Sequence, residues 1–391
     1  MKDSQRKNRR IRVAAAIVAV LALAACLMLP RQSVEQQLRA IEAARAIPDS
    51  ENAAVIYDKL LAEVGELPLC ADLFDKDTCS IIGSCPWSTS EYPRVAEWIG
   101  GHKQTIAMLL EAAKFERCRF PIGDLSAESE VERMNRNAAI RGWAGILLDL
   151  AAGNDLGEGR IDDAIAKYRC IVQLGRHVCQ QPFTLERSDG RWMETVGLNR
   201  LIELIGLLEP DNSELDAIEQ LPVEIGDHWR ERAEEMLRVE RLLYRGRCSA
   251  IARVKDFVAG YPLEKYFESE RDESRNVLLY RRVFKITIAL ARYRNKRGHW
   301  PASLDEVREL APPQSFIDPV NGESLVYETW RSSIFDSTFK LYSKGKNGID
   351  EGGRYSAAID PNSLEVIVEE DDDLFWPPRR LFEESNTEAQ E

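Results

Sequence analysis

The sequence has few of the residues from which most catalytic and metal sites are built. Only four histidines occur among its 391 residues, which leaves few candidates for a histidine-based metal site or catalytic triad. No CxxC pair is present, and zinc sites need clustered ligands. The GxSxG, HExxH, Walker A and glycine-rich dinucleotide-binding patterns are missing as well. These absences favour a binding protein over an enzyme.

Basic residues are also fewer than acidic ones. Lysine and arginine number 52 against 65 aspartates and glutamates, so the formal net charge is −13. A general nucleic-acid binder presents a basic face that neutralises phosphates, and we therefore expect no nucleic-acid partner. Hydrophobic residues make up 44% of the chain, which is enough to bury a large core. The length suits about two domains.

The N-terminus concentrates the basic residues that are present. Residues 1–12 form a basic segment, and an unbroken apolar run follows at 13–29. This run is either a short membrane anchor or a lipoprotein signal in which Cys26 is acylated. In both cases the positive-inside bias keeps the basic segment in the cytosol. We therefore expect an inner-membrane anchor, with residues 31–391 on the periplasmic side of a bacterial cell envelope.

The cysteines suit an exported protein, because an oxidising compartment permits disulfides. Cys170 and Cys179 are nine residues apart in a predicted helix, on opposite faces, so they should not bond to each other. Several other cysteines lie in a stretch rich in glycine and proline, where a local disulfide could crosslink the chain. Four cysteines are our disulfide candidates: Cys70, Cys79, Cys85 and Cys118.

Hydrophobic periodicity predicts a helical body over residues 31–265. Glycine, proline and Asn-Asp clusters separate its helical segments, and no regular repeat period appears. Short connectors between paired helices indicate an irregular stack of helical hairpins. After two helices near the N-terminus of the body, the predicted helices cover approximately residues 94–116, 130–153, 160–180, 192–208 and 227–245.

The pattern changes after residue 266, where we expect a small α+β module that extends to residue 378. Residues 274–295 are apolar almost all round, so this helix must be buried. Four runs typical of strands follow, at 325–328, 335–342, 355–359 and 364–368. Residues 379–391 form an acidic tail that we expect to be disordered. The fold class is therefore mainly α, with a C-terminal α+β module.

Three motifs in this module appear in the order found in a known family. They are Tyr293–Glu306 after the long helix, Asp318–Tyr327, and Leu341–Gly348 with the acidic end Asp371–Leu374. Together they resemble the C-terminal domain of the type II secretion system protein G family, the major pseudopilins. The body resembles uncharacterised bacterial envelope proteins that carry such a module, notably at Cys118–Pro121.

The resemblance implies a calcium site, because the family binds Ca²⁺ with this loop and the acidic end. Asn347 stands where the family has an aspartate, which removes one negative charge and should weaken binding. The alternative is that 369–373 is a solvated acidic run and the loop an ordinary hairpin. The matching positions are the carbonyl of Leu341 together with Ser343, Asn347, Asp371 and Asp373, and the further candidate Asp350 lies nearby, as does Asp372.

The chain also departs from the family, because no pseudopilin processing site precedes its long helix. Assembly into a pilus-like fibre is therefore not expected, and the module serves for packing or contact. We interpret the chain as a membrane-tethered envelope protein that acts by contact with an unidentified protein partner. The alternatives are an envelope hydrolase with a site that no motif reveals, and a component of type II secretion.

Overall fold

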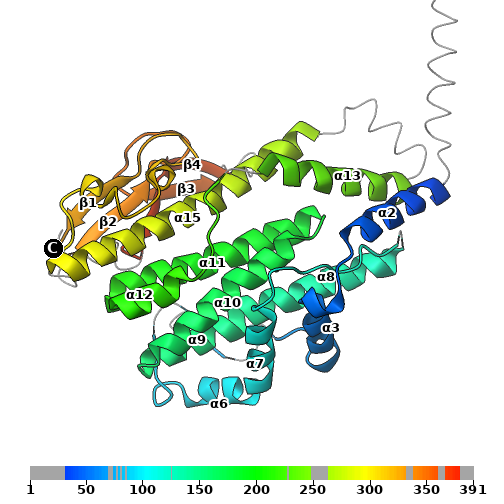
Figure 1. The fold of residues 1–391 in the computed structure, drawn as a ribbon, viewed down its shortest axis with the longest axis horizontal. Helices are drawn as coiled ribbons and strands as arrows, with labels where there is room; N and C mark the ends of the chain where they lie inside the picture. Colours follow the sequence, from blue (N-terminus) through cyan, green and yellow to red (C-terminus); the bar gives the residue numbers. More distant parts are fainter. Residues whose placement is uncertain are drawn as a thin grey trace, which may run out of the picture.

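The computed structural model describes most of the chain beyond residue 30. The described residues are 31–68, 74–75, 78–79, 82–83, 86–124, 126–226, 229–247, 263–331, 338–359 and 366–378. Within them the protein is mainly helical, with small antiparallel sheets near the C-terminus (Figure 1). The predicted class, mainly α with C-terminal strands, is confirmed at this level. The acidic tail at 379–391 lies outside the described residues.

The helical body runs from α2 to α13. A 3-10 turn, η1 (Asp49–Glu51), precedes α3, and a π-helical stretch, η2 (Trp143–Leu148), joins α8 directly to α9. The α-helices of the body are α2 (Arg31–Arg45), α3 (Ala54–Glu63), α6 (Pro93–Gly101), α7 (Lys103–Ala112), α8 (Ala127–Gly142), α9 (Asp149–Gly157), α10 (Ile161–Cys179), α11 (Thr184–Leu208), α12 (Asn212–Glu219) and α13 (Trp229–Arg247).

Local signals explain several of these boundaries. Ser126 caps α8 by accepting the N–H of Ser129, and Asp211 with Glu214 forms a capping box at α12. The single helix predicted over 94–116 is instead two helices. The chain breaks at His102, whose backbone leaves the helical region with φ −107° and ψ 17°, a departure that hydrophobic periodicity does not reveal.

Helices α10 and α11 pack with their backbones in contact. A Cβ atom on Gly175 would lie 2.5 Å from the carbonyl oxygen of Gly190, and one on Gly197 would lie 2.9 Å from the backbone nitrogen of Val172. Real Cβ atoms do not approach other atoms so closely. Glycine is therefore needed at this crossing, which brings the polar side chains of the two helices together.

A long helix, α15 (Leu263–Arg297), lies along α11 (Figure 1). The sequence predicts it over 274–295, and the prediction that it is buried is confirmed: residues such as Val283 and Phe284 are fully buried. The domain boundary expected at residue 266 falls inside the first turn of this helix. The helix therefore belongs to both parts of the molecule.

Short 3-10 turns, η3 (Leu304–Val307) and η4 (Pro313–Phe316), lead from α15 into the strands. One antiparallel sheet has the order β1-β2-β5, and β3 pairs with β4 in a separate antiparallel ribbon. The last strand, β5, was not predicted from the sequence. The strands are β1 (Val326–Trp330), β2 (Thr338–Ser343), β3 (Tyr355–Ile359), β4 (Val366–Asp371) and β5 (Asp373–Trp376).

The body and the module share one hydrophobic core. A single cluster of buried residues extends from α3 through α10 and α11 to β5. At the junction, the indole of Trp376 covers Gly206 of α11, where an added Cβ would lie 2.5 Å from the ring. The C-terminal strands are thus packed against the helices over a close contact that only glycine allows.

The prediction of a membrane-spanning helix needs correction. In the part of the chain that the structure describes, none of the helices is both long enough and apolar enough to cross a membrane. The segments 1–12 and 13–29, on which that prediction was placed, lie outside the described residues, as does Cys26.

The structure tests some of the predictions about the cysteines. Cys79 is disulfide-bonded, whereas Cys118 is a buried free thiol, so its candidacy for a disulfide is wrong. Cys118 is fully buried in the main core. Cys170 and Cys179 also carry free thiols, as their placement on opposite helix faces predicts. The remaining candidates, Cys70 and Cys85, lie outside the described residues.

Candidate functional site

Three carboxylates converge where the loop after β2 meets the junction of β4 and β5. Glu351 is in that loop, Asp371 ends β4, and Asp372 connects β4 to β5. One carboxylate oxygen from each lies within 4.8 Å of those of the other two. Carboxylate oxygens are the ligands that hard divalent cations prefer, so this acidic cluster, Glu351 with Asp371 and Asp372, is a candidate metal centre.

Backbone amides hold one oxygen of each aspartate in the acidic cluster. Asp372 Oδ2 accepts the N–H groups of Glu351 at 3.0 Å and Gly353 at 2.8 Å. Asp371 Oδ2 accepts the N–H groups of Lys346 at 2.8 Å and Asn347 at 3.2 Å. These bonds orient both carboxylates and tie the loop to the end of β4.

The second oxygen of each aspartate lacks a partner. Oδ1 of Asp371 and Oδ1 of Asp372 are buried and have no hydrogen-bond partner among the described residues. Asp372 itself has no exposed surface. A buried acceptor without a partner is costly, and a buried charge needs a counter-charge or a proton. The described residues supply no lysine or arginine ion pair to the acidic cluster.

A proton shared within the acidic cluster neutralises part of its negative charge. Burial, together with the neighbouring Glu351, raises the pKa of Asp372 to about 7. Burial acts to raise the pKa of Glu351 too, but hydrogen bonds, above all the one from the Asn347 amide, hold it below its usual range. Below about pH 7 the pair therefore retains a proton, which a divalent cation would displace.

Gly345 lets the loop pass close to Asp371. Its φ is +61°, in the left-handed region, and a Cβ there would lie 2.2 Å from the Asp371 carbonyl oxygen. Both the backbone conformation and the lack of space require glycine. The loop can therefore direct its amides at the Asp371 carboxylate.

The structure brings only one of the residues implied by the family resemblance into the acidic cluster, namely Asp371. Asn347 touches the cluster through its amide nitrogen, which donates to Glu351 at 2.8 Å. Asp350 instead accepts the Tyr342 hydroxyl at 2.9 Å.

The other positions implied by the resemblance have different partners. The Ser343 hydroxyl donates to Asp318. Leu341 and Asp373 take part in the ladder between β2 and β5, where Leu341 pairs with Trp376 and Asp373 with Ser343. The family resemblance therefore did not point to Glu351, and it gave Asp372 only as a neighbour of the matching positions. The two glycines that follow Glu351 were the available signal, because they let the loop turn back toward β4.

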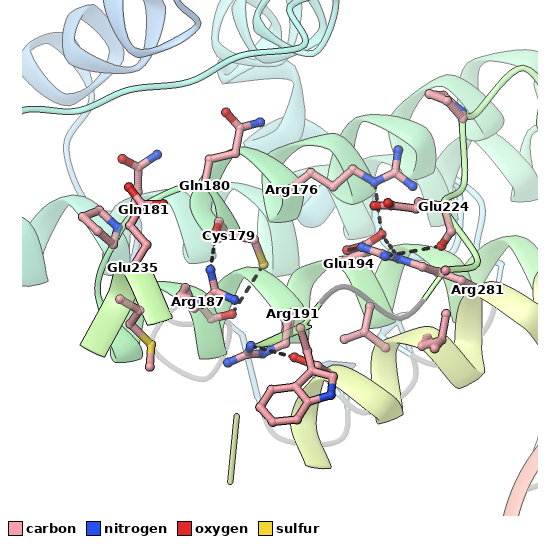
Figure 2. A pocket seen from close by; sticks show the side chains of 18 of the residues that line it. Arg176, Cys179, Gln180, Gln181, Arg187, Arg191, Glu194, Glu224, Glu235 and Arg281 are labelled. Atoms are coloured by element: carbon pink, nitrogen blue, oxygen red, sulfur yellow. Dashed lines mark hydrogen bonds and ion pairs between the residues drawn. The ribbon is translucent and has the colours of Figure 1, made fainter. Parts of the chain in front are cut away.

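A second site is a cavity of about 440 Å³ lined by residues of α10, α11, α13 and α15. Figure 2 shows Arg176 and Arg281 converging on Glu194. The Nε atoms of the two arginines lie 3.0 and 2.9 Å from Glu194 Oε1. Burial acts to raise the pKa of Glu194, but the guanidinium groups of Arg281 and Arg176 outweigh it and hold the pKa below its usual range.

A second carboxylate beside this cavity is also held by two arginines. Glu270 of α15 accepts Arg187 Nε at 3.0 Å and Arg191 Nη2 at 2.7 Å. Between these groups lies Cys179, whose thiol donates to the Arg187 carbonyl oxygen at 3.5 Å. Burial raises the pKa of this thiol, so Cys179 stays protonated and a poor nucleophile.

No protein-family model, curated protein or solved structure that was compared with this chain matches it. The two sites are therefore interpreted from their own geometry and chemistry.

Proposed function

We propose that this chain acts by contact with another protein through a calcium-stabilised C-terminal module of the kind that the type II secretion protein G family carries. The observation that carries the proposal is the pair of buried, unpartnered oxygens on Asp371 and Asp372 beside Glu351. A site with this composition is built for a cation, because no cationic side chain of the described residues pairs with it.

The donor set fits calcium. Ca²⁺ takes six to eight oxygen ligands from carboxylates, carbonyls and water in flexible geometry, whereas Mg²⁺ demands a near-ideal octahedron. Glu351, Asp371 and Asp372 would hold the ion. When bound, the ion supplies positive charge to three clustered carboxylates. It would then fasten the loop at 344–354 to the β4–β5 junction more firmly than the amide hydrogen bonds do alone.

Exposed apolar side chains near the acidic cluster support a role in protein contact. Ile349, Tyr355 and Val368 are 62%, 49% and 46% exposed, and each lies within a few residues of a clustered carboxylate along the chain. Exposed apolar side chains mark interaction sites when they form one patch, and we propose that these three do so. A cation that orders the loop would fix Ile349 relative to the β3–β4 ribbon.

The disulfide supports a compartment outside the cytosol. Cys79 is disulfide-bonded, and such bonds persist mainly in secreted proteins and in the bacterial periplasm. Calcium modules of extracellular proteins bind with dissociation constants of about 10⁻⁴ to 10⁻³ M. A three-carboxylate site of moderate affinity would suit such a compartment.

Calorimetric titration of the full chain with Ca²⁺, and separately with Mg²⁺, tests the metal site. We expect saturable Ca²⁺ binding that weakens at least about tenfold in Asp372→Asn, since one charged ligand is lost. The matched control is Asp350→Asn, which removes one charge from the same loop but outside the acidic cluster, and its affinity should stay within about twofold of the wild type. Absence of Ca²⁺ binding at millimolar concentration would overturn the proposal, and the reverse pattern in the two variants would reject the ligands named here.

Site-specific photo-crosslinking tests the protein contact. A photo-reactive residue at position 349 should give a crosslinked product in the producing cells, and chelation of calcium should abolish it. The control position is Val55, which is 47% exposed on α3 of the body. Equal crosslinking at both positions, or none at position 349, would contradict contact through the module.

A further inference from the structure

The cavity lined by α10, α11, α13 and α15 has a composition that the calcium proposal does not use. Its residues come from both parts of the molecule, because Arg176 is on α10, Arg191 on α11 and Arg281 on α15. Figure 2 shows these side chains around one space, with Glu194 and Glu224 toward one end and Arg187 and Arg191 toward the other. The close crossing of α10 and α11 therefore creates a concentration of guanidinium groups.

Positive charge is in excess around the cavity. Five arginines line it, namely Arg119, Arg176, Arg187, Arg191 and Arg281. Four carboxylates face them: Glu194, Glu224 and Glu235 in the lining, and Glu270 behind it. A fifth, Glu273, reaches Arg191 at 3.0 Å, but its side chain is 37% exposed and is screened by solvent. Glu224 and Glu235 are exposed as well, so around the cavity the arginines outnumber the buried carboxylates, Glu194 and Glu270.

Donor atoms of these arginines are left without acceptors. Nε of Arg191 and Nη2 of Arg176 are buried and have no hydrogen-bond partner among the described residues. The Arg191 side chain is 92% buried, since only 8% of it is exposed. Leaving such groups unsatisfied is costly unless a ligand or water completes them.

Arg119 provides a further cation. Its Nη1 donates to neutral oxygens alone within the described part of the chain: the carbonyls of Cys118 and Gln180, and the Gln180 side chain. Guanidinium groups pair with carboxylates in a bidentate manner. The neighbouring residues therefore compensate the positive charge of Arg119 only in part.

Part of the remaining lining is apolar. Met236 of α13 and Val277 and Leu278 of α15 line the same space, and the volume of about 440 Å³ is typical of small-molecule sites. We propose that this cavity binds a small amphipathic carboxylate, with its anionic group among the arginines and its apolar chain against α13 and α15. The apolar part of the lining suits a carboxylate that carries a hydrocarbon chain better than it suits inorganic phosphate.

This proposal is independent of the calcium site, because no residue is shared between the two. Either one can fail while the other stands. If ligand binds, it bridges α10 and α11 to α15, and so stabilises the junction between the body and the C-terminal module.

Binding of octanoate to the full chain tests the proposal, measured by ligand-observed saturation-transfer NMR and by calorimetry. Octanamide has the same shape without the charge, and inorganic phosphate has the charge without the apolar chain. We expect saturable octanoate binding with a dissociation constant of about 1 mM or below, and at least tenfold weaker binding of the other two compounds. Equal binding of octanoate and octanamide, tighter binding of phosphate, or no binding of octanoate would each overturn the proposal.

Two variants locate the binding. Arg176→Lys keeps the positive charge near Glu194 but loses the unpartnered Nη2, and Arg119→Gln removes the partly matched cation. Each should weaken octanoate binding about five- to tenfold. The control is Arg308→Lys, at an arginine that is 61% exposed and pairs with Asp305 on η3, and it should bind as the wild type does. If one of the two cavity variants does not fold, the other still tests the site. Unchanged affinity of the folded variant for octanoate would reject the cavity as the binding site.

Discussion

Two of the buried clusters of charge in this molecule are balanced in opposite ways. In the helical body, Glu194 and Glu270 are each held between two arginines. In the C-terminal module, three carboxylates lie together, and among the described residues only backbone amides and one asparagine side chain donate to them. The first cluster carries its own counter-ions in excess, whereas the second requires a proton or a cation from outside.

The difference shows what each cluster can do. Arg281 and Arg176 hold the pKa of Glu194 below its usual range, so this carboxylate positions helices as an ion pair and leaves spare donors for an anion. A group of carboxylates without counter-charge changes state with pH and with metal concentration. The body is therefore expected to be stable independently of metal, and the module to respond to it.

Removing the central carboxylate of the body should have the largest effect. Glu194→Ala leaves Arg176 and Arg281 buried without their counter-ion, and should reduce the free energy of unfolding by about 3–5 kcal/mol. Urea denaturation measures the loss. The control Glu111→Ala breaks an exposed pair with Lys114 and should cost about 0.5 kcal/mol or less. A loss below about 1 kcal/mol at Glu194 would show that the body does not depend on its ion pairs.

The response of the module to calcium should come next in size. At pH 8, Ca²⁺ at about 100 times its dissociation constant should add about 2.7 kcal/mol to the free energy of unfolding. Urea midpoints with and without chelator measure this gain. Asp372→Asn should lose most of it, and a variant that keeps the full gain would contradict the assignment of the acidic cluster.

The same cluster predicts a pH dependence without calcium. The pKa of Asp372 is raised to about 7 in the folded protein, so from pH 4 to 7 the folded chain holds a proton that the unfolded chain has released. Stability from this group therefore falls as pH rises. His177, whose pKa burial lowers to about 4, acts in the opposite direction below pH 6.5. The difference between the pH dependence of the wild type and that of Asp372→Asn isolates the aspartate. Saturating Ca²⁺ displaces the proton and should therefore abolish this pH dependence in the wild type.

The contact between the two parts can be tested at Gly206. Gly206→Ala would place a Cβ 2.5 Å from the Trp376 ring, and overpacking of this kind costs about 1–3 kcal/mol. Gly100→Ala is the control, because nothing lies within 4 Å of its Cβ position. Calorimetry should show a lower melting temperature for Gly206→Ala alone. An unchanged melting temperature would mean that the module is not coupled to the body there.

The smallest expected effect concerns a cation outside the acidic cluster. Arg354 lies next to the cluster in the loop but pairs with Glu370 at 2.8 Å. Arg354→Gln removes its repulsion of the metal, and should tighten Ca²⁺ binding about twofold, as expected for an exposed charge. A weaker affinity in calorimetry would indicate that Arg354 orders the loop instead.

Much of the secondary structure follows from local sequence pattern. The helix predicted over 160–180 is α10 at Ile161–Cys179, and the strand predicted over 355–359 is β3 at Tyr355–Ile359. Both have strong apolar periodicity and clear boundaries. The start of α11 at Thr184 was missed by eight residues, because its first turns bury charged side chains such as Glu186 and Arg187 that a hydrophobic pattern does not register.

The sites followed from sequence only in part. The acidic end and the glycine-rich loop indicated a metal site, and Asp371 is common to the prediction and the structure. Glu351 joins it from 20 positions earlier because Gly345, Gly352 and Gly353 turn the loop back. The arginine cavity has no sequence signature, since Arg187 and Glu270 are 83 residues apart in the chain.

The sequence by itself determined the helical periodicity, the acidic charge, the turn to strands after residue 297 and the presence of a carboxylate-rich end. Those properties depend on neighbours within a few residues, where side-chain spacing and backbone preference act. Only the tertiary structure decided which charges meet. Glycine-lined helix crossings and loop reversals bring residues from distant segments within hydrogen-bond distance, and burial then makes their pairing, or the lack of it, energetically decisive.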